Sequence, residues 1–253
     1  MNKFFRLALQ ASFLAIFIAG CETGDPKPRL SMFVGVDISG SFTKSGYYDN
    51  AIEFLSYYIY AHLNGTGGLE TPNVLFVSSI GGASANEPKT FYPKQMFESK
   101  SVDSIAAQLR EIFPAGSENR YTDYNAFFEQ VASTVRNRKL LLRPISIVMI
   151  TDGVPDVKKE GKTDFRSINL KPLEALSRSI TVRVLYTSAE TGRSWQTSVP
   201  RSRVKVWTQD ASVMVSWKDP SILAELQPLD AQPKFIRWVE ENVDFGVSAR
   251  RVD

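Results

Sequence analysis

Short runs of apolar residues along this chain alternate with longer segments in which apolar residues recur every three or four positions. The short runs are typical of buried strands, and we expect strands over residues 30–36, 73–80, 91–97, 145–150, 181–186, 204–207 and 212–217. The longer segments predict helices over residues 47–63, 102–112, 122–138, 173–179 and 235–243. Strands that alternate with helices imply βαβ units. The pattern therefore predicts an α/β fold, with a doubly wound, mostly parallel sheet flanked by helices.

Two segments fit this alternation less well. Residues 156–164 are rich in charge and predict a mobile surface loop, and residues 189–203 show no clear period. The strand expected at 181–186 differs from the others because polar and apolar side chains alternate along it.

The first 20 residues have the pattern of an export signal. Lys3 and Arg6 precede an apolar run from residue 7 to residue 20, which at about 14 residues is too short for a comfortable membrane span. The run closes with Ile18-Ala19-Gly20-Cys21, which resembles the lipobox of bacterial lipoproteins. The resemblance implies that residues 1–20 are a removed signal peptide and that Cys21 is acylated. A plain signal peptide and an uncleaved anchor are the alternatives.

Cys21 is the only cysteine of the chain, so its acylation would exclude an intramolecular disulfide, a thiolate metal site and a cysteine nucleophile. Residues 21–29 would then form a lipidated tether, and residues 30–253 one domain. The eight residues after Cys21 reach at most roughly 25–30 Å, which keeps the domain near the membrane. Glu22 follows the cysteine, and by the sorting rule of enteric bacteria this predicts the outer membrane, facing the periplasm.

Composition and charge exclude other classes. Hydrophobic residues make up 43% and charged residues 23% of the chain, as in ordinary soluble domains. The formal charge of +3 comes from 30 basic and 27 acidic residues. Without Lys3 and Arg6 it falls to +1, from 28 basic residues against 27. We therefore expect no nucleic-acid partner.

Oxygen-bearing side chains occur where the predicted elements end. Asp37, Ser39 and Ser41 follow the first strand, Thr122 opens the middle helix, and Asp152 follows the strand at 145–150. In an open α/β sheet the loops at the carboxyl ends of the strands meet in one crevice. We therefore expect these two carboxylates and three hydroxyls to lie close together.

This set of side chains favours a particular class of ligand. Carboxylate and hydroxyl oxygens suit hard cations such as Mg²⁺, Mn²⁺ or Ca²⁺, and no soft ligand is present to attract zinc or copper. Mg²⁺ takes six oxygens and keeps water where the protein supplies too few. Neutral hydroxyls leave the ion electrophilic, so a carboxylate from a partner could replace one water.

The motif Asp37-x-Ser39-x-Ser41, with Thr122 and the later Thr-Asp-Gly around Asp152, resembles the von Willebrand factor type A family. The resemblance implies a Rossmann-like fold from about residue 30 to residue 247 and a metal-ion-dependent adhesion site. Ser39 and Ser41 would bind the metal directly, and the other three directly or through water. It implies a non-enzymatic module whose protein partner presents an Asp or Glu to the metal. Two segments depart from the family: residues 119–121 replace glycines, and residues 192–217 have no counterpart.

Three other interpretations compete. The serines and threonines could merely cap helices, and Thr-Asp-Gly could be an ordinary turn, so that the site holds no metal. Residues 33–44 also resemble the first phosphate loop of the actin-like ATPase superfamily, which joins two strands of a hairpin. Asp37 could instead be the nucleophile of a Mg²⁺-dependent phosphohydrolase, although Ser39 stands where a second carboxylate or base would be expected. His62, the only histidine, is expected to cap helix carbonyls or face solvent.

Overall fold

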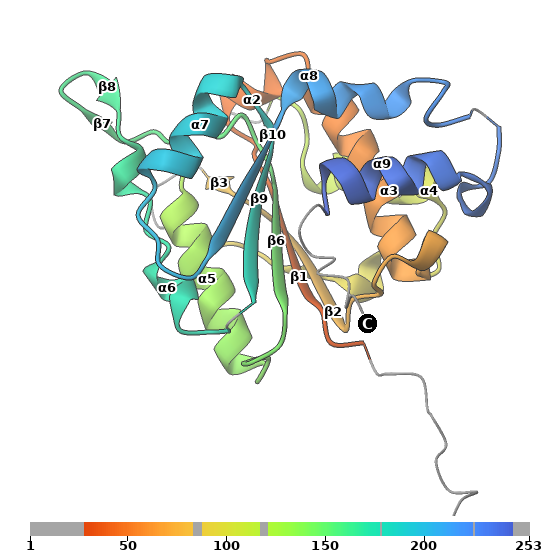
Figure 1. The fold of residues 1–253 in the computed structure, drawn as a ribbon, viewed down its shortest axis with the longest axis horizontal. Coiled ribbons are helices and arrows are strands. Elements are labelled where there is room, and N and C mark those ends of the chain that lie inside the picture. Colours follow the sequence, from red (N-terminus) through yellow and green to blue (C-terminus); the bar gives the residue numbers. More distant parts are fainter. Residues whose placement is uncertain (1–27, 83–87, 117–120, 178, 225, 245–253) are drawn as a thin grey trace, which may run out of the picture.

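A six-stranded sheet forms the centre of the molecule, in the order β10-β9-β6-β1-β2-β4 (Figure 1). The computed structural model describes residues 28–82, 88–116, 121–177, 179–224 and 226–244. All neighbouring strands of the sheet are parallel except β4, which runs antiparallel to β2 at one edge. The strands are β1 (Ser31–Val36), β2 (Val74–Ser79), β4 (Tyr92–Pro93), β6 (Ile145–Ile150), β9 (Ile180–Thr187) and β10 (Lys205–Asp210). Two-residue strands form two small pairs outside it: β3 (Gly81–Gly82) with β5 (Tyr121–Thr122), and β7 (Lys158–Lys159) with β8 (Lys162–Thr163).

Helices cover both faces of the sheet, and each face has its own apolar core (Figure 1). One face carries α3 (Tyr48–Asn64), α4 (Val102–Ile112) and α9 (Pro233–Asn242). The other carries α5 (Tyr124–Asn137), α6 (Lys171–Glu174) and α7 (Ala189–Ser198). The remaining helices are short: α2 (Gly40–Thr43), α8 (Ala211–Met214), η1 (Thr66–Gly68), η2 (Lys94–Met96), η3 (Phe165–Ser167), η4 (Val215–Lys218) and η5 (Leu229–Ala231). The predicted doubly wound, mostly parallel α/β sheet is confirmed.

The central strands are apolar because helices exclude water from both of their faces. Every residue of β1 and of β6 is buried. At Gly35 helix α5 approaches the sheet so closely that a Cβ atom would lie 2.8 Å from Cζ of Phe127 and 2.7 Å from Cγ1 of Ile80. Only glycine fits there, since such separations are shorter than any van der Waals contact.

The strand order reverses between β1 and β6. The chain leaves β1 through α3 to reach β2 on one side, whereas it leaves β6 through α6 to reach β9 on the other side. Because α3 and α6 lie on opposite faces, the loops after β1 and β6 diverge at the carboxyl edge of the sheet. Ligands of open α/β sheets bind at such a switch point.

Several sequence predictions were wrong in detail. The strand expected at 212–217 is helical, as α8 and η4, because the Asp210 carboxylate accepts the backbone N–H of Ser212 and caps a helix start. The helix expected at 173–179 is α6 and ends at Glu174, and the strand expected at 91–97 is reduced to β4 followed by η2.

Two further segments acquire structure that the sequence did not indicate. Residues 156–164 contain the hairpin β7–β8, which projects from the carboxyl edge of the sheet (Figure 1). Residues 189–203 contain α7, whose side-chain cap is Ser188. Cys21, the predicted signal peptide and most of the predicted tether lie outside the described residues. No helix among the residues described has both the length and the apolar character needed to span a membrane.

Candidate metal centre

Asp37 is the first residue after β1 and lies fully buried at the switch point. Its backbone N–H donates to the carbonyl of Ile150 at 2.8 Å, so the pairing of β1 with β6 continues to this residue. One oxygen of its carboxylate, Oδ1, accepts the backbone N–H of Ser39 at 2.8 Å, and the other, Oδ2, accepts the hydroxyl of Thr151 at 2.6 Å. The carboxylate is therefore held in one orientation from both sides.

Thr151 connects three parts of the site, although the sequence did not identify it as a site residue. Besides donating to Asp37, its Oγ1 accepts the backbone N–H of Gly153 at 3.0 Å and lies 2.8 Å from the hydroxyl of Tyr124. Tyr124 stands in the first turn of α5, two residues after Thr122. The hydroxyl of Thr151 thereby ties the ends of β1 and β6 to the start of α5.

Ser39 and Ser41 lie together after β1, with their hydroxyl oxygens 3.1 Å apart. Ser39 is buried and stands at the start of α2, but its side chain caps no backbone group there. Ser41 is exposed and lies inside α2. The interpretation of these two hydroxyls as helix caps is therefore wrong.

Thr122 lies in β5, whose partner is β3, and not inside the middle helix as expected. The residue that caps α5 is Asp123, whose side chain accepts the backbone N–H of Ala126. Thr122 is buried, and its own backbone N–H donates to the carboxylate of Asp156. A capping role for Thr122 is therefore wrong as well.

Asp152 is partly exposed, and its Oδ1 accepts the backbone N–H of Val154 at 3.0 Å. This bond and the Gly153–Thr151 bond form ordinary turns, as the structural interpretation of Thr-Asp-Gly expected. Gly153 adopts φ +79°, which favours glycine. The turn also leaves the second carboxylate oxygen of Asp152 without a hydrogen bond among the described residues.

The negative charges of this site act on one another. Burial raises the pKa of Asp37 to about 6; the hydrogen bond from Thr151 opposes this rise, and the nearby Asp152 carboxylate adds to it. Burial, followed by the charges of Asp37, Asp152 and Asp156, raises the pKa of Tyr124 well above its ordinary value. All three carboxylates therefore act on the same tyrosine hydroxyl. A cation would relieve this repulsion and the cost of burying Asp37 as an anion.

The donor set fits a hard divalent cation. Asp37 and Asp152 would supply the charge, and Ser39, Ser41 and Thr122 would supply neutral oxygens. Among the residues described, no three His, Cys, Asp or Glu side chains lie close enough to hold a metal by themselves. A cation here would therefore depend on the hydroxyls and on water. Such a shell leaves a place for a carboxylate from outside.

The sequence missed three residues besides Thr151. Asp156 reaches Thr122 from the segment that was expected to be a mobile loop. Trp195, on α7, is buried, donates from Nε1 to the carbonyl of Gly153 at 2.7 Å and meets the ring of Tyr124 edge-on at 5.2 Å. The only sequence signal was the position of Tyr124, two residues after Thr122. For Trp195 and Asp156 no local pattern gave one.

The structure contradicts the interpretation of residues 33–44 as an actin-like phosphate loop. Strands β1 and β2 are parallel and joined through α3, so residues 33–44 do not form the hairpin that an actin-like phosphate loop needs.

His62 is buried, not exposed: Nδ1 lies 2.9 Å from the carbonyl of Glu70, and Nε2 lies 3.0 Å from Asp244 Oδ2. Its partner Asp244 follows α9, on the face of the sheet that α3 covers, so this histidine serves the core rather than the site.

Comparisons with known proteins identify no family. No family model matches the chain, and no curated protein matches it. Solved structures with partial similarity include manganese-loaded TRAP protein of Plasmodium vivax, at 16% identity over 76% of this chain and 73% of that one, with a TM-score of 0.48. Human COPII-coat protein Sec24c matches at 10% identity over 73% of this chain and 30% of its own, with a TM-score of 0.48. The SpRpn10 VWA domain matches at 12% identity over 74% and 94%, with a TM-score of 0.40.

Proposed function

We propose that this chain is a lipid-anchored, cation-dependent protein-binding module of the von Willebrand factor type A kind. The observation that carries the proposal is the arrangement around Asp37. Its buried carboxylate lies at the switch point of the sheet, beside the paired hydroxyls of Ser39 and Ser41 and within reach of the charge of Asp152. The cation is Mg²⁺, or Mn²⁺ or Ca²⁺ in its place. A protein partner completes the shell with an Asp or Glu.

The binding role is favoured over catalysis by what surrounds the carboxylates. Hydrolysis at a metal site needs a base or nucleophile near the substrate. Among the described residues, the groups that hydrogen-bond to Asp37 are the hydroxyls of Thr151 and Ser39 and the backbone N–H of Ser39, and His62 is engaged elsewhere with Asp244. These hydrogen bonds hold the Asp37 carboxylate in place, which suits the binding of a cation or of a metal-bound water.

The cation is tested by thermal unfolding of the full chain in detergent, with Mg²⁺, Mn²⁺ or Ca²⁺ and with chelator. A cation at 100 times its Kd adds about 2.7 kcal/mol of stability, or about 5–10 °C in Tm for a domain of this size. We expect Asp37→Asn to abolish this shift. Asp103→Asn, an equal change at an exposed position of α4, should keep it. A shift that survives in Asp37→Asn would contradict the site.

The partner is tested by cross-linking in the native envelope, with and without chelator. A captured protein should be lost on chelation and in Asp37→Asn, and retained in Asp103→Asn. Capture that is equal under all conditions would mean that the partner binds without the metal.

The anchor is proposed at Cys21, with the mature protein in the outer membrane facing the periplasm. Metabolic labelling with a palmitate analogue should mark the wild type and not Cys21→Ser. Gradient fractionation should find the labelled protein with outer-membrane markers. Labelling of Cys21→Ser, or sedimentation with inner-membrane markers, would contradict the respective part of the proposal.

A further inference from the structure

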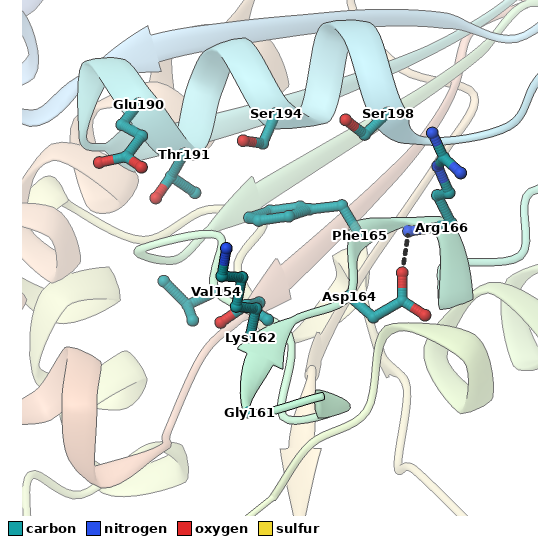
Figure 2. Close-up of a pocket in the computed structure, with 11 residues that line it drawn as sticks. Val154, Gly161, Lys162, Asp164, Phe165, Arg166, Glu190, Thr191, Ser194 and Ser198 are labelled. Atoms are coloured by element: carbon teal, nitrogen blue, oxygen red, sulfur yellow. Dashed lines mark hydrogen bonds between the residues drawn. The ribbon is translucent and has the colours of Figure 1, made fainter. Parts of the chain in front are cut away.

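A groove of about 650 Å³ lies next to the candidate metal centre, between the hairpin β7–β8 and helix α7 (Figure 2). We call it the α7 groove and define it by Val154, Lys162, Phe165, Arg166, Ser194 and Ser198, which line it. It is separate from the five predicted metal-binding residues, none of which lines it.

The α7 groove begins at Val154, two residues beyond Asp152 of the metal centre. The backbone N–H of Val154 donates to the carboxylate of Asp152. Thr191, also in the lining, lies so close to Gly153 that a Cβ added to the glycine would meet its Cγ2 at 3.0 Å. A chain that placed a carboxylate on the cation and ran toward α7 would therefore enter this groove directly.

Two serine hydroxyls in the lining can form hydrogen bonds with a ligand. Ser194 and Ser198 project from α7 over the ring of Phe165, which lies beneath the helix (Figure 2). Neither serine side chain forms a hydrogen bond with other described residues, and both are partly buried. Their hydroxyls can donate to the backbone carbonyls of a peptide, and the aromatic ring can cover its apolar atoms.

The lining of the groove carries two cations and two acidic residues. Lys162 and Arg166 are exposed, and within the described chain neither forms an ion pair. Of the two acidic residues in the lining, Asp164 already accepts the backbone N–H of Arg166 at 3.0 Å. Glu190 lies in the first turn of α7, where the helix dipole favours its charge. Lys162 and Arg166 are thus exposed cations that an acidic side chain of a partner can reach.

We propose that the α7 groove binds the partner segment next to the metal-coordinating residue, and that it selects an extended peptide with a further acidic side chain. This inference rests on the proposed function. The wall from Thr191 to Ser198 spans seven helical steps, or about 10 Å at about 1.5 Å each. About three residues of extended chain cover this length at about 3.3 Å each.

The test uses fluorescent peptides and the full chain in detergent. Each probe has one Asp in a Gly/Ser background, and the acidic set adds a Glu three to six residues away, on either side. The matched set has Gln at the same place. In Mg²⁺ we expect the best acidic peptide to bind about three- to tenfold more tightly than its Gln counterpart, as two partly exposed ion pairs would give. Fluorescence polarisation measures both affinities.

The charge reversal Lys162→Glu with Arg166→Glu should remove this preference and leave the Mg²⁺-dependent affinity for the Gln peptides unchanged. Lys234→Glu with Arg237→Glu makes the same change of charge on exposed positions of α9 and should keep the preference. Equal, Mg²⁺-dependent binding of both peptide sets would overturn the role of the groove and leave the proposed function standing. If the peptides still bind in chelator, the groove does not act together with the metal. If no peptide binds in a Mg²⁺-dependent way, the role of the groove and the proposed function are both contradicted.

Discussion

The hydroxyl of Thr151 donates a 2.6 Å hydrogen bond to Oδ2 of Asp37, and so joins the carboxyl ends of the neighbouring strands β6 and β1. The bond lies in the buried interior, where a hydrogen bond to a charged group is worth more than one at the surface. It aligns the carboxylate at the switch point before any ligand arrives. The pre-formed geometry of the candidate metal centre thus depends on a residue that is not itself among the predicted ligands.

Thr151→Val removes that hydroxyl and keeps the shape of the side chain. Asp37 Oδ2, the hydroxyl of Tyr124 and the backbone N–H of Gly153 would lose their partner, which costs about 1–3 kcal/mol per buried unsatisfied group. We expect a loss of stability of at least that size in urea unfolding. Thr181→Val changes another buried threonine, at the amino end of β9, and should lower the stability by less.

The same variant should bind Mn²⁺ about tenfold more weakly, since a misplacement of one ligand costs roughly 1.4 kcal/mol or more. Electron paramagnetic resonance of free Mn²⁺ in a titration measures this affinity. An affinity equal to that of the wild type would show that Thr151 does not position Asp37.

Trp195→Phe tests whether helix α7 supports the metal centre. The indole donates to the carbonyl of Gly153, the residue after Asp152, and phenylalanine would leave that carbonyl without its donor. We expect Mn²⁺ affinity to fall several-fold and stability to fall by about 1–3 kcal/mol. Trp217→Phe, at an equally buried tryptophan on the α3 face of the sheet, should lose stability but keep the affinity. Equal Mn²⁺ affinities in the two variants would show that α7 does not support metal binding.

The parts of this structure that the sequence predicts are those with strong local signals. Strand β6 is apolar except for Ser146 and was placed with its observed bounds, as was α4, whose apolar residues recur at helical spacing. Residues 212–217 carry signals for both kinds of element. Apolar residues at alternate positions favour a strand, whereas Asp210 before them favours a helix start, and the segment is helical because Asp210 caps it. Local pattern decides an element only where one period is clear.

Burial by distant partners cannot be predicted from local pattern. Arg183 lies on β9, where polar and apolar residues alternate, yet its guanidinium is buried, donating to Ser146 Oγ at 2.8 Å and to the carbonyl of Val243 at 2.6 Å. In the candidate site the motif residues around Asp37 were found because their spacing is local. Asp156 and Trp195 were not, because α7 and the segment before β7 reach the site only through the tertiary fold.

Gly35→Ala tests the close approach of α5 to β1. The added methyl would clash with the side chains of Ile80 and Phe127, both buried in the core. Overpacking of this kind costs about 1–3 kcal/mol, and we expect a lower urea midpoint with an unchanged m-value. Gly40→Ala, where no atom lies within 4 Å of the added carbon, should leave the midpoint unchanged. A neutral Gly35→Ala would mean that the two elements are farther apart than described.

His62 and Asp244 should make stability depend on pH. Burial alone would lower the pKa of His62, but the Asp244 carboxylate and the Glu70 carbonyl raise it above its ordinary value. Burial opposes the ionisation of Asp244, but His62, Arg183 and Tyr58 together lower its pKa. The raised pKa of His62 contributes stability that is complete below about pH 6.5 and is lost as the pH rises through the folded value. The lowered pKa of Asp244 contributes stability that is complete above about pH 4 and is lost on acidification.

Wild-type protein should therefore lose stability in urea unfolding between pH 6 and pH 8.5, and His62→Gln should show a smaller loss over that range. Glutamine can still hydrogen-bond to Asp244 but carries no proton that titrates. Asn64→Gln, two residues along the same helix in an exposed position, should keep the wild-type dependence. If His62→Gln and the wild type lose stability in parallel, the titrating group lies elsewhere and the pair contributes only through its hydrogen bonds.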